Sequence, residues 1–422
     1  MTRQDIIIVG AGPAGLIAAG KLGKAGYSVT LLEKMEQTGK KLRMTGKGRC
    51  NVTNSRPKSE FINAFGKNGK FLHSAFSRFF SNDLVAFFQQ NLHIDLMEER
   101  GGRIFPVSQN AHEIADKLTQ WATQHHVTLL YNHQCVELLL HNNRIQAIKC
   151  KTPNGLKTFE TKAVLLSTGG TSYPSTGSSG DGYLLAQQAG HTIIPPLPAL
   201  VPLTTKESET FKLSGLSIKN AQVTVFINNK PTHAIFGEFL FTHFGLSGPV
   251  ILTLSRDVVE NLQKNKAVYV EIDFKPALTE KVLDARLIRE FVRHHNKKLK
   301  NIMPLLLPEA LGMLCLEQTG VLGDMWCHSV PAADRKKLVQ WMKHFRLTIT
   351  GYRSLEEAIV THGGVCLKEV DPITMQSKIV SNLFFAGELL DLDADTGGYN
   401  LQAAFSTGWC AAEGMLSLLT QL

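Results

Sequence analysis

Near the amino terminus, hydrophobic positions follow two different periods within about thirty residues. A continuous aliphatic run over 5–9 leads into a glycine-rich turn, and a helix-like pattern follows over 16–25. A second aliphatic run over 28–32 ends at Glu33. Short continuous apolar runs are typical of buried parallel strands, whereas apolar residues at a period near 3.6 indicate a helix. The pattern predicts a strand–turn–helix–strand unit, which is the start of an α/β fold.

The turn between the first strand and the helix reads Gly10-Ala11-Gly12-Pro13-Ala14-Gly15, a GxGxxG spacing. Its glycines allow a tight turn, close approach of the backbone to a pyrophosphate, and close packing of the helix on the sheet. Unpaired N–H groups at the start of the helix attract phosphate. Glu33 stands 18 residues after Gly15, where a carboxylate accepts hydrogen bonds from a ribose diol. The segment therefore predicts a site for FAD or NAD.

Other glycine-rich segments are spread along the chain, but a second dinucleotide fingerprint does not occur. One such segment spans 39–54, and aliphatic runs over 163–167 and 382–386 each open into a glycine turn. Gly397-Gly398 precedes a further helical pattern. Distant loops of this kind are expected when a single extended cofactor is wrapped by the whole chain, which favours FAD.

The pattern changes in the middle of the chain. After four prolines between 195 and 202, the runs over 221–227 and 267–274 predict strands. From Thr279 onward, apolar residues return at spacings of three and four, which predicts helices. We therefore expect an FAD-binding domain over 1–193 and 348–422, a β-rich insertion over 194–278 and a helical cap over 279–347.

Composition narrows the class of protein. Of the 422 residues, 43% are hydrophobic and 19% are charged, which permits a large core and excludes disordered and fibrous classes. No apolar stretch reaches the roughly 20 residues that a bilayer requires, and the amino terminus lacks a signal-peptide pattern. We expect a cytoplasmic protein without integral membrane association. The seven cysteines form no CxxC pair, and without a Cys/His cluster we expect no metal site.

The formal net charge of +9 leaves nucleic acid, anionic lipid and phosphorylated cofactors open as partners. Four of the cations lie on one face of the helix predicted over 279–300: Arg286, Arg289, Arg293 and Lys297. The simplest interpretation is a solvated face opposite the apolar stripe. Contact with nucleic acid or a membrane is one alternative, and attraction of an acidic substrate or a nicotinamide dinucleotide is another.

Seven longer segments carry a family resemblance: GKGRCNVTN, GGRIFPVSQNA, STGGTSYPSTGSSGDGY, PALVPL, FTHFGLSGP, GGVCLKEVDPITMQSK and FFAGELLDLDADTGGYNLQAA. In this order they resemble the BaiN/RdsA-type, or YhiN-like, NAD(P)/FAD-dependent oxidoreductases of the glutathione-reductase-like FAD superfamily. The resemblance spans nearly the whole chain. It implies a discontinuous Rossmann-type FAD-binding domain, and an enzyme that passes a hydride or electron pair between flavin and a small organic substrate with NAD(P)H as transient donor.

The resemblance also implies contacts with the cofactor. The glycines of the first turn would hold the pyrophosphate, Glu33 the adenosine ribose, the backbone of Val136 the adenine, and Glu388 the ribityl hydroxyls. An ordinary buried strand valine is the alternative at 136. The amino-terminal amides of the last helix would face the N1 and O2 edge of the flavin, where the reduced ring is negative. The full set of expected contacts is Gly10, Ala11, Gly12, Pro13, Ala14, Gly15, Glu33, Lys34, Lys41, Gly48, Arg49, Cys50, Asn51, Val136, Thr168, Gly169, Gly170, Gly387, Glu388, Gly398, Asn400 and Leu401.

Three residues are candidates for proton transfer or charge stabilisation. His243 titrates in the right range for an acid or base, although a structural histidine fits the same pattern. Tyr173 lies in a motif expected beside the flavin. Arg49 is a cation that suits the reduced flavin, a phosphate or a solvated loop equally. The sequence does not rank the other polar residues of these motifs, Asp391, Asp393 and Tyr399.

Other functions are compatible with the same residues. The charge and the basic helix suit a flavin-dependent RNA-modifying or nucleic-acid-binding protein. The flavin elements alone suit an amine or ketone oxidase that uses oxygen, or a flavin-carrying scaffold without turnover. The resemblance favours a reductase acting on an activated double bond. We expect a small-molecule substrate and no stable nucleic-acid partner, and the sequence predicts no oligomeric state.

Overall fold

The computed structural model describes residues 3–421, which divide into two compact units. Unit 1 runs from the amino terminus to Ala199 and resumes at Leu355, and unit 2 spans Leu200–Ser354. The sequence placed these junctions six and seven residues earlier, at 193/194 and 347/348. They differ because β10 (Ile193–Ala199) pairs with β17 (Val360–Val365) inside unit 1, whereas β16 (Phe345–Tyr352) belongs to unit 2.

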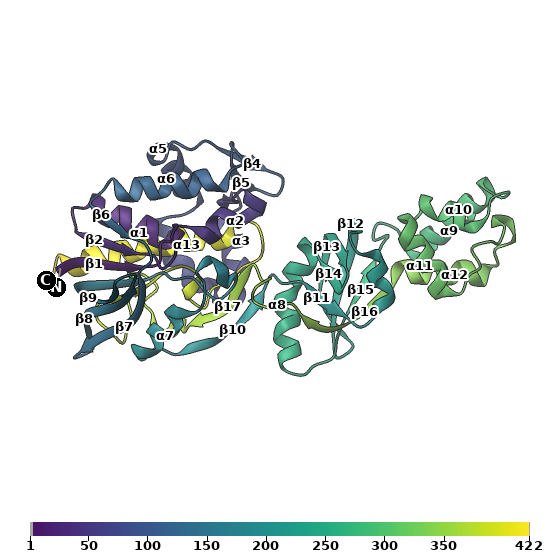
Figure 1. The fold of residues 1–422 in the computed structure, drawn as a ribbon. Helices are drawn as coiled ribbons and strands as arrows, with labels where there is room; N and C mark the ends of the chain where they lie inside the picture. The colour runs from purple at the N-terminus through teal and green to yellow at the C-terminus, as the bar shows by residue number, and fades with distance from the viewer. Residues whose placement is uncertain (1–2, 422) are drawn as a thin grey trace. The chain divides into compact units, whose positions relative to one another are not determined.

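Unit 1 is built on a seven-stranded sheet in the order β6-β2-β1-β9-β8-β7, with β18 paired to β9 (Figure 1). Five strands run parallel: β1 (Arg3–Val9), β2 (Val29–Leu32), β6 (Val127–Leu130), β9 (Gly155–Leu166) and β18 (Leu383–Phe385). Two are antiparallel: β7 (Gln134–His141) and β8 (Arg144–Thr152). The predicted Rossmann-type α/β class is confirmed. β18 arrives from the far end of the chain, which makes the domain discontinuous.

The aliphatic runs form strands because both faces of the sheet are covered. Ile6, Ile7 and Ile8 of β1 are each 0% exposed. Helix α1 (Pro13–Lys24) packs against α6 (Ala111–Thr123) and against the long last helix α13 (Tyr399–Leu419). The contact between α1 and α13 is close: a Cβ added at Gly408 would lie 2.4 Å from the carbonyl oxygen of Ala14.

The remaining elements of unit 1 surround this sheet. The helices are α2 (Lys40–Gly48), α3 (Lys58–Ala64), α4 (His73–Arg78), α5 (Ser81–Asn91) and α7 (Asp181–Gln188), with short 3₁₀ segments η1 (Gly66–Leu72) and η7 (Gly387–Leu389). A three-stranded sheet joins β3 (Thr53–Asn54), β5 (Arg103–Pro106) and β4 (Leu96–Glu99). The backbone of α2 leaves helical geometry at 45–47, inside the segment that sequence analysis identified as glycine-rich.

Unit 2 is a closed barrel with appended helices. The barrel order is β11 (Leu203–Thr205), β14 (Gly245–Ser247), β13 (Lys230–Thr242), β12 (Ser217–Ile227), β15 (Val268–Asp273) and β16. The helices are α8 (Pro249–Gln263), α9 (Glu280–Arg293), α10 (Leu299–Ile302), α11 (Glu309–Thr319) and α12 (Ala332–Lys343). Val270 of the barrel and Leu287 and Leu338 of the helices share one hydrophobic core. The β-rich and helical segments that the sequence separated at 278/279 thus form one unit. Within residues 3–421, no helix has both the length and the apolarity needed to cross a bilayer.

The contact between α1 and α13 predicts the effect of a larger residue at its centre. In Gly408→Leu, the new side chain meets the backbone of Ala14 and forces the two helices apart. We expect the free energy of unfolding to fall by about 1–3 kcal/mol, which urea denaturation measures. Ser417→Leu places the same side chain at an exposed position of α13 and should leave the midpoint nearly unchanged. Equal losses in both variants would contradict this account of the packing.

Candidate functional site

The turn between β1 and α1 forms an open cradle at the carboxyl end of β1. Gly10 has a φ of 100°, and its added Cβ would lie 2.6 Å from the carbonyl oxygen of Ser167. The Cβ of a residue at position 15 would lie 2.0 Å from the carbonyl oxygen of Gly10. At Gly12, in contrast, an added Cβ would have no described atom within 4 Å. Because no side chain in the described part of the chain caps α1, its first N–H groups face this open space, which is the arrangement that binds a phosphate.

Glu33 connects the end of β2 to the same turn. Its Oε2 accepts a hydrogen bond from the N–H of Ala11 at 3.0 Å, and its Oε1 accepts one from the N–H of Met35 at 2.9 Å. Burial raises the pKa of the Glu33 carboxyl, and these backbone donors partly oppose that rise. The carboxylate therefore lies beside the cradle, where the sequence analysis expects the ribose.

Lys34, another expected cofactor contact, takes part in an ion pair. Its Nζ lies 2.9 Å from Oδ2 of Asp181 at the start of α7 and also donates to Ser179. Gln134 of β7 donates to the same Oδ2 at 2.8 Å. Although burial disfavours the charged form, these hydrogen bonds hold the pKa of the Asp181 carboxyl below its usual range. No local pattern in the sequence marks Asp181 or Gln134 as neighbours of this edge.

Val136 lies at a β-bulge. Cys135 pairs with Cys150 and Glu137 pairs with Lys149, so Val136 is left out of the β7–β8 register. Its side chain is 37% exposed, and its carbonyl oxygen accepts a hydrogen bond from Gln188 at 3.3 Å. A bulge turns the backbone of the extra residue away from the partner strand. The alternative of an ordinary buried valine does not describe this position, and the bulge is compatible with a backbone contact to adenine.

Glu388 is the centre of a polar network that joins four distant segments. Its Oε2 lies 2.6 Å from Nζ of Lys41 in α2. Its Oε1 accepts hydrogen bonds from the hydroxyl of Ser172 and from the N–H of Thr361 in β17, both at 2.9 Å. Lys41 also donates to Oγ of Ser172 at 2.5 Å. Two expected cofactor contacts that are 347 residues apart, Lys41 and Glu388, are therefore direct partners of each other.

The same network fixes the turn after β9. The hydroxyl oxygen of Thr361 accepts hydrogen bonds from the N–H groups of Thr171 and Ser172, at 2.8 and 3.0 Å. At Gly170, an added Cβ would lie 2.3 Å from that hydroxyl oxygen, so glycine is required at this position. Sequence reasoning missed Thr361 and Ser172, because a threonine within a short strand and a serine in a serine-rich loop give no local signal of a long-range contact.

Residues near the carboxyl terminus also lie close to the start of α1 and to β3. Gly387 has a φ of 74°, its N–H donates to Oγ1 of Thr407 at 3.0 Å, and its added Cβ would lie 3.2 Å from that of Ala14. Gly398 has a φ of 93°, and its added Cβ would lie 2.5 Å from the carbonyl oxygen of Thr53. Asn400 uses its side chain to hold the N–H and the carbonyl oxygen of Ala394, both at 2.9 Å. These contacts bring α1, β3, η7 and the start of α13 together.

Two buried side-chain oxygens supply a direct test of whether FAD fits these residues. Oδ1 of Asn51 and Oγ1 of Thr168 are buried, and neither has a hydrogen-bond partner among residues 3–421. Buried polar atoms are nearly always hydrogen-bonded, so both oxygens call for a partner outside the chain. An extended cofactor with phosphate, hydroxyl and ring N–H groups matches these two oxygens, the cradle, Glu33 and the bulge at Val136. The residues present therefore fit FAD.

The side chain of Arg49 is held by residues from distant parts of unit 1. The guanidinium pairs with Glu99 of β4 and with Gln109, and it lies 4.3 Å from the ring centroid of Phe105. Lys47, which stands in a loop expected to be glycine-rich, has a φ of 58° in the left-handed region. Cys50 is fully buried, and burial raises the pKa of its thiol to about 12, so it carries no thiolate near neutral pH.

The three catalytic candidates from the sequence are in different places. Arg49 and Tyr173 belong to unit 1, together with the glycine segments. Tyr173 has a φ of 51°, and its N–H donates to the carbonyl oxygen of Leu355 at 3.1 Å. His243 belongs to unit 2, in the exposed turn between β13 and β14 beside the ring of Phe244.

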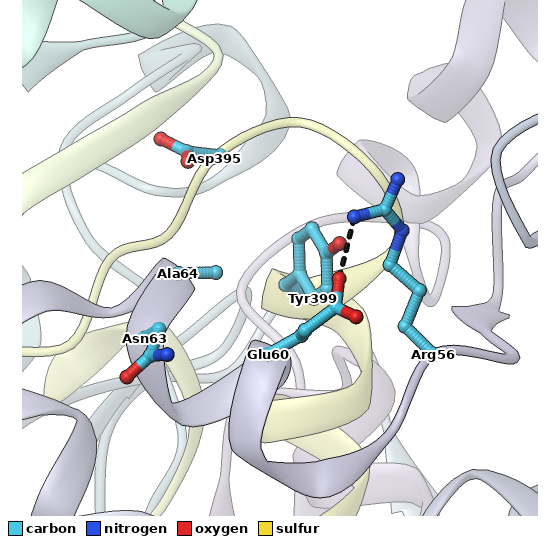
Figure 2. A pocket seen from close by; sticks show the side chains of 6 residues that line it. All are labelled: Arg56, Glu60, Asn63, Ala64, Asp395 and Tyr399. Carbon is cyan, nitrogen blue, oxygen red and sulfur yellow. Dashed lines mark hydrogen bonds and ion pairs between the residues drawn. The ribbon is translucent and has the colours of Figure 1, made fainter. Parts of the chain in front are cut away.

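A pocket of about 280 Å³ lies in unit 1 at the start of α13. Figure 2 shows Arg56 and Glu60, which form an ion pair, beside the ring of Tyr399. Burial raises the pKa of the Tyr399 phenol, and its ring packs edge-on against Phe61 with centroids 4.7 Å apart. The pocket is lined by Arg56, Glu60, Asn63, Ala64, Asp395 and Tyr399.

Comparison with known proteins assigns the family. The model of the HI0933-like protein Rossmann domain matches residues 4–414. The chain belongs to the HI0933-like family. A ribosomal RNA dihydrouridine synthase of Haemophilus influenzae is 30% identical over 413 residues, which are 97% of this chain and 98% of that protein. A 3-dehydro-bile acid delta(4,6)-reductase of Clostridium scindens is 30% identical over 412 residues, 96% of this chain and 97% of that protein.

Solved structures show the same fold at much lower identity. A 3-ketosteroid delta1-dehydrogenase from Sterolibacterium denitrificans has a TM-score of 0.55 at 13% identity, covering 99% of this chain and all of that one. The open form of a flavocytochrome c3 fumarate reductase has a TM-score of 0.53 at 16% identity, covering 98% and 78%. The family resemblance read from the sequence is confirmed. As an HI0933-like protein, the chain has an FAD-binding Rossmann domain and is a flavin-dependent oxidoreductase.

The open position at Gly12 predicts a separation of folding from cofactor binding. In Gly12→Asp, the new carboxylate occupies the space where the phosphates of FAD would lie and repels them, while the backbone φ of −80° suits any residue. Because Asp is a favourable residue at a helix N-cap, we expect unfolding of the FAD-free protein to be unchanged or stabilised by about 0.5–1 kcal/mol. We expect FAD affinity, measured by quenching of flavin fluorescence, to fall at least about 100-fold, roughly 2.7 kcal/mol. Unchanged affinity would contradict a phosphate site at this turn.

The network around Glu388 predicts the effect of removing its cation. In Lys41→Met, the partly buried carboxylate loses its ion pair, and we expect a loss of about 1–3 kcal/mol in the free energy of unfolding together with weaker FAD binding. Lys40→Met, in the same helix, breaks only the pair with the exposed Glu36, a neighbour four residues away, and should leave both quantities nearly unchanged. Urea denaturation and FAD titration of the two variants make the comparison. Identical behaviour of both variants would exclude a structural role for the network.

Proposed function

We propose that this protein is an FAD-dependent reductase of a carbon–carbon double bond conjugated with a carbonyl group, with NAD(P)H as the hydride donor. The observation that carries the proposal is a single dinucleotide-binding region in unit 1 whose cradle, Glu33 and partnerless oxygens at 51 and 168 fit FAD. The names of the two relatives support the reaction class, because a dihydrouridine synthase and a delta(4,6)-reductase both add hydrogen across such a bond.

The chain's own residues would bind and orient the cofactor. When bound, FAD supplies hydride transfer between NAD(P)H and the substrate. The uncapped start of α1 holds negative charge through its backbone N–H groups, and Glu33 accepts hydroxyl hydrogens. The start of α13, which also lacks a side-chain cap in the described structure, favours negative charge nearby by about 0.3–1 kcal/mol, and up to about 2 when partly buried.

The distribution of charge favours RNA as the substrate. Unit 2 contains 21 Lys and Arg against 14 Asp and Glu, whereas unit 1 contains 24 against 22. Seven of the nine excess positive charges therefore belong to unit 2. Its helix α9 exposes Arg289 and Arg293, and the exposed Lys297 follows. A positive surface attracts a polyanion and gives no advantage with a sterol. We therefore propose a uridine of ribosomal RNA as substrate, which places the activity in the cytoplasm.

The direct test is reduction of RNA by the FAD-loaded protein. Anaerobic mixing with NADH and then NADPH should bleach the oxidised-flavin absorption with at least one of them. Addition of unmodified ribosomal RNA should restore the absorption and produce dihydrouridine, detected as a 2 Da mass increase in a nuclease digest. If neither nucleotide bleaches the flavin, NAD(P)H is not the hydride donor. If the protein reduces a steroid enone but not RNA, the proposal that RNA is the substrate is wrong.

The role of unit 2 predicts the salt dependence of RNA binding. We expect affinity to fall steeply with salt, because phosphate contacts release counterions. Removing two contacts in Arg289→Ala with Arg293→Ala should reduce the slope of log K against log salt by about 1–2 and weaken binding about 10-fold at physiological salt. Lys24→Ala with Lys70→Ala removes two exposed charges of unit 1 and is the matched control. Equal effects of both double variants in a gel-shift titration would contradict the proposed surface.

A further inference from the structure

A histidine–aspartate pair lies in unit 1, and its histidine is not among the residues that the sequence identified. His362 is in β17, and Asp393 follows η7. Nδ1 of His362 lies 2.7 Å from Oδ1 of Asp393, and the side chains are 12% and 4% exposed. A carboxylate at Nδ1 fixes the orientation of the imidazole and favours its charged form. A charged imidazole held in this way can act as a general acid.

The pair is next to the network around Glu388. Thr361, which precedes His362, donates its N–H to Oε1 of Glu388 at 2.9 Å. Gly364 has a φ of 138°, and its added Cβ would lie 2.6 Å from the carbonyl oxygen of Leu389. The segment that carries His362 is therefore fixed against η7 by contacts on both sides. Lys41 and Glu388 of this network are both residues expected beside the cofactor.

A second acid is part of the same cluster. Asp391 accepts hydrogen bonds from the side chain of Asn68 in η1, at 2.9 Å to Oδ2 and 2.8 Å to its carbonyl oxygen. Burial raises the pKa of the Asp391 carboxyl, the charge of His362 lowers it, and Asp393 raises it again. Lys67 of η1 also acts on this carboxyl. Asp393 contacts the histidine directly and Asp391 interacts with it electrostatically, and a carboxylate beside the ring favours the imidazolium.

We propose that His362 is the acid that protonates the substrate, and that Asp393 is its positioning residue. This inference rests on the proposed function, in which hydrogen is added across an activated double bond. NAD(P)H supplies the hydride that is added to the first carbon. The imidazolium gives the proton on Nε2 to the second carbon. The π bond breaks, two C–H bonds form, NAD(P)⁺ and neutral imidazole remain, and the imidazole regains a proton from water.

The first test separates the two halves of the reaction in His362→Gln. The amide of glutamine can still donate to Asp393, but it does not titrate near neutral pH. We expect the rate of flavin bleaching by NAD(P)H to change less than about twofold, whereas reoxidation by the substrate slows at least about 100-fold. His344→Gln is the matched control, because His344 is also held by carboxylates, Glu271 and Glu280, in unit 2. Both of its half-reactions should be unchanged.

The second test measures the pair without turnover. NMR titration of the His362 imidazole should give a pKa above the ordinary value of about 6.5. Since the carboxylate favours the imidazolium, Asp393→Asn should lower that pKa. The imidazolium then loses its proton at a lower pH. The midpoint of the pH profile of substrate-dependent reoxidation should therefore move to lower pH by the same amount. Asp393→Glu, which keeps the charge, should restore much of the shift.

The outcomes distinguish this proposal from the function on which it rests. Equal slowing of both half-reactions in His362→Gln, or slowing of neither, would overturn the role of His362. If that variant does not retain FAD, the NMR titration of the wild type and of Asp393→Asn decides, and an unchanged His362 pKa overturns the proposal. If NAD(P)H bleaches the flavin of the wild-type protein but the protein reduces neither RNA nor a steroid enone, the proposed function is wrong. A His362 pKa at the ordinary value would independently exclude the charged pair.

Discussion

The structure depends on close approach of backbone segments where side chains are absent. Position 10 must accommodate the carbonyl of Ser167, position 15 the carbonyl of Gly10, and position 408 the carbonyl of Ala14, all at distances that no Cβ permits. These contacts hold α1 against the sheet and against α13. Because the start of α1 is placed in this way, its N–H groups face open space at Gly12 and provide positive potential without a charged side chain.

Charged side chains in unit 1 mostly stabilise the walls of this region. Lys41 pairs with Glu388, Lys34 with Asp181, and Arg49 with Glu99, and each pair joins segments far apart in sequence. Partly buried ions that satisfy one another fix loops at defined distances, which a flexible surface charge does not do. Two of the buried atoms that have no hydrogen-bond partner in the described chain are neutral oxygens, at Asn51 and Thr168, and they match a neutral or hydroxyl-rich part of a ligand.

The two units divide the physical tasks that the proposed reaction requires. Unit 1 contains the glycine cradle, the polar network and the pair of His362 and Asp393. Unit 2 contains most of the excess positive charge on a barrel and helices that share one core. Binding of a polyanion and control of a proton need different environments, the first solvated and diffuse, the second buried and directional. A fold with separate cores supplies both.

The sequence by itself determined the Rossmann-type unit, its interruption by an insertion, and the glycine turn with Glu33, because these follow from local periodicity and from steric limits on single residues. Its motifs also identified the family. The tertiary structure decided that Glu388 pairs with Lys41, that a bulge exposes Val136, and that His362 meets Asp393. In the structure, the junctions between the two units lie at the end of β10 and just after β16, because strand pairing determines the unit to which each strand belongs. Such contacts join positions up to 347 residues apart, and no local pattern encodes which of several buried ions will meet.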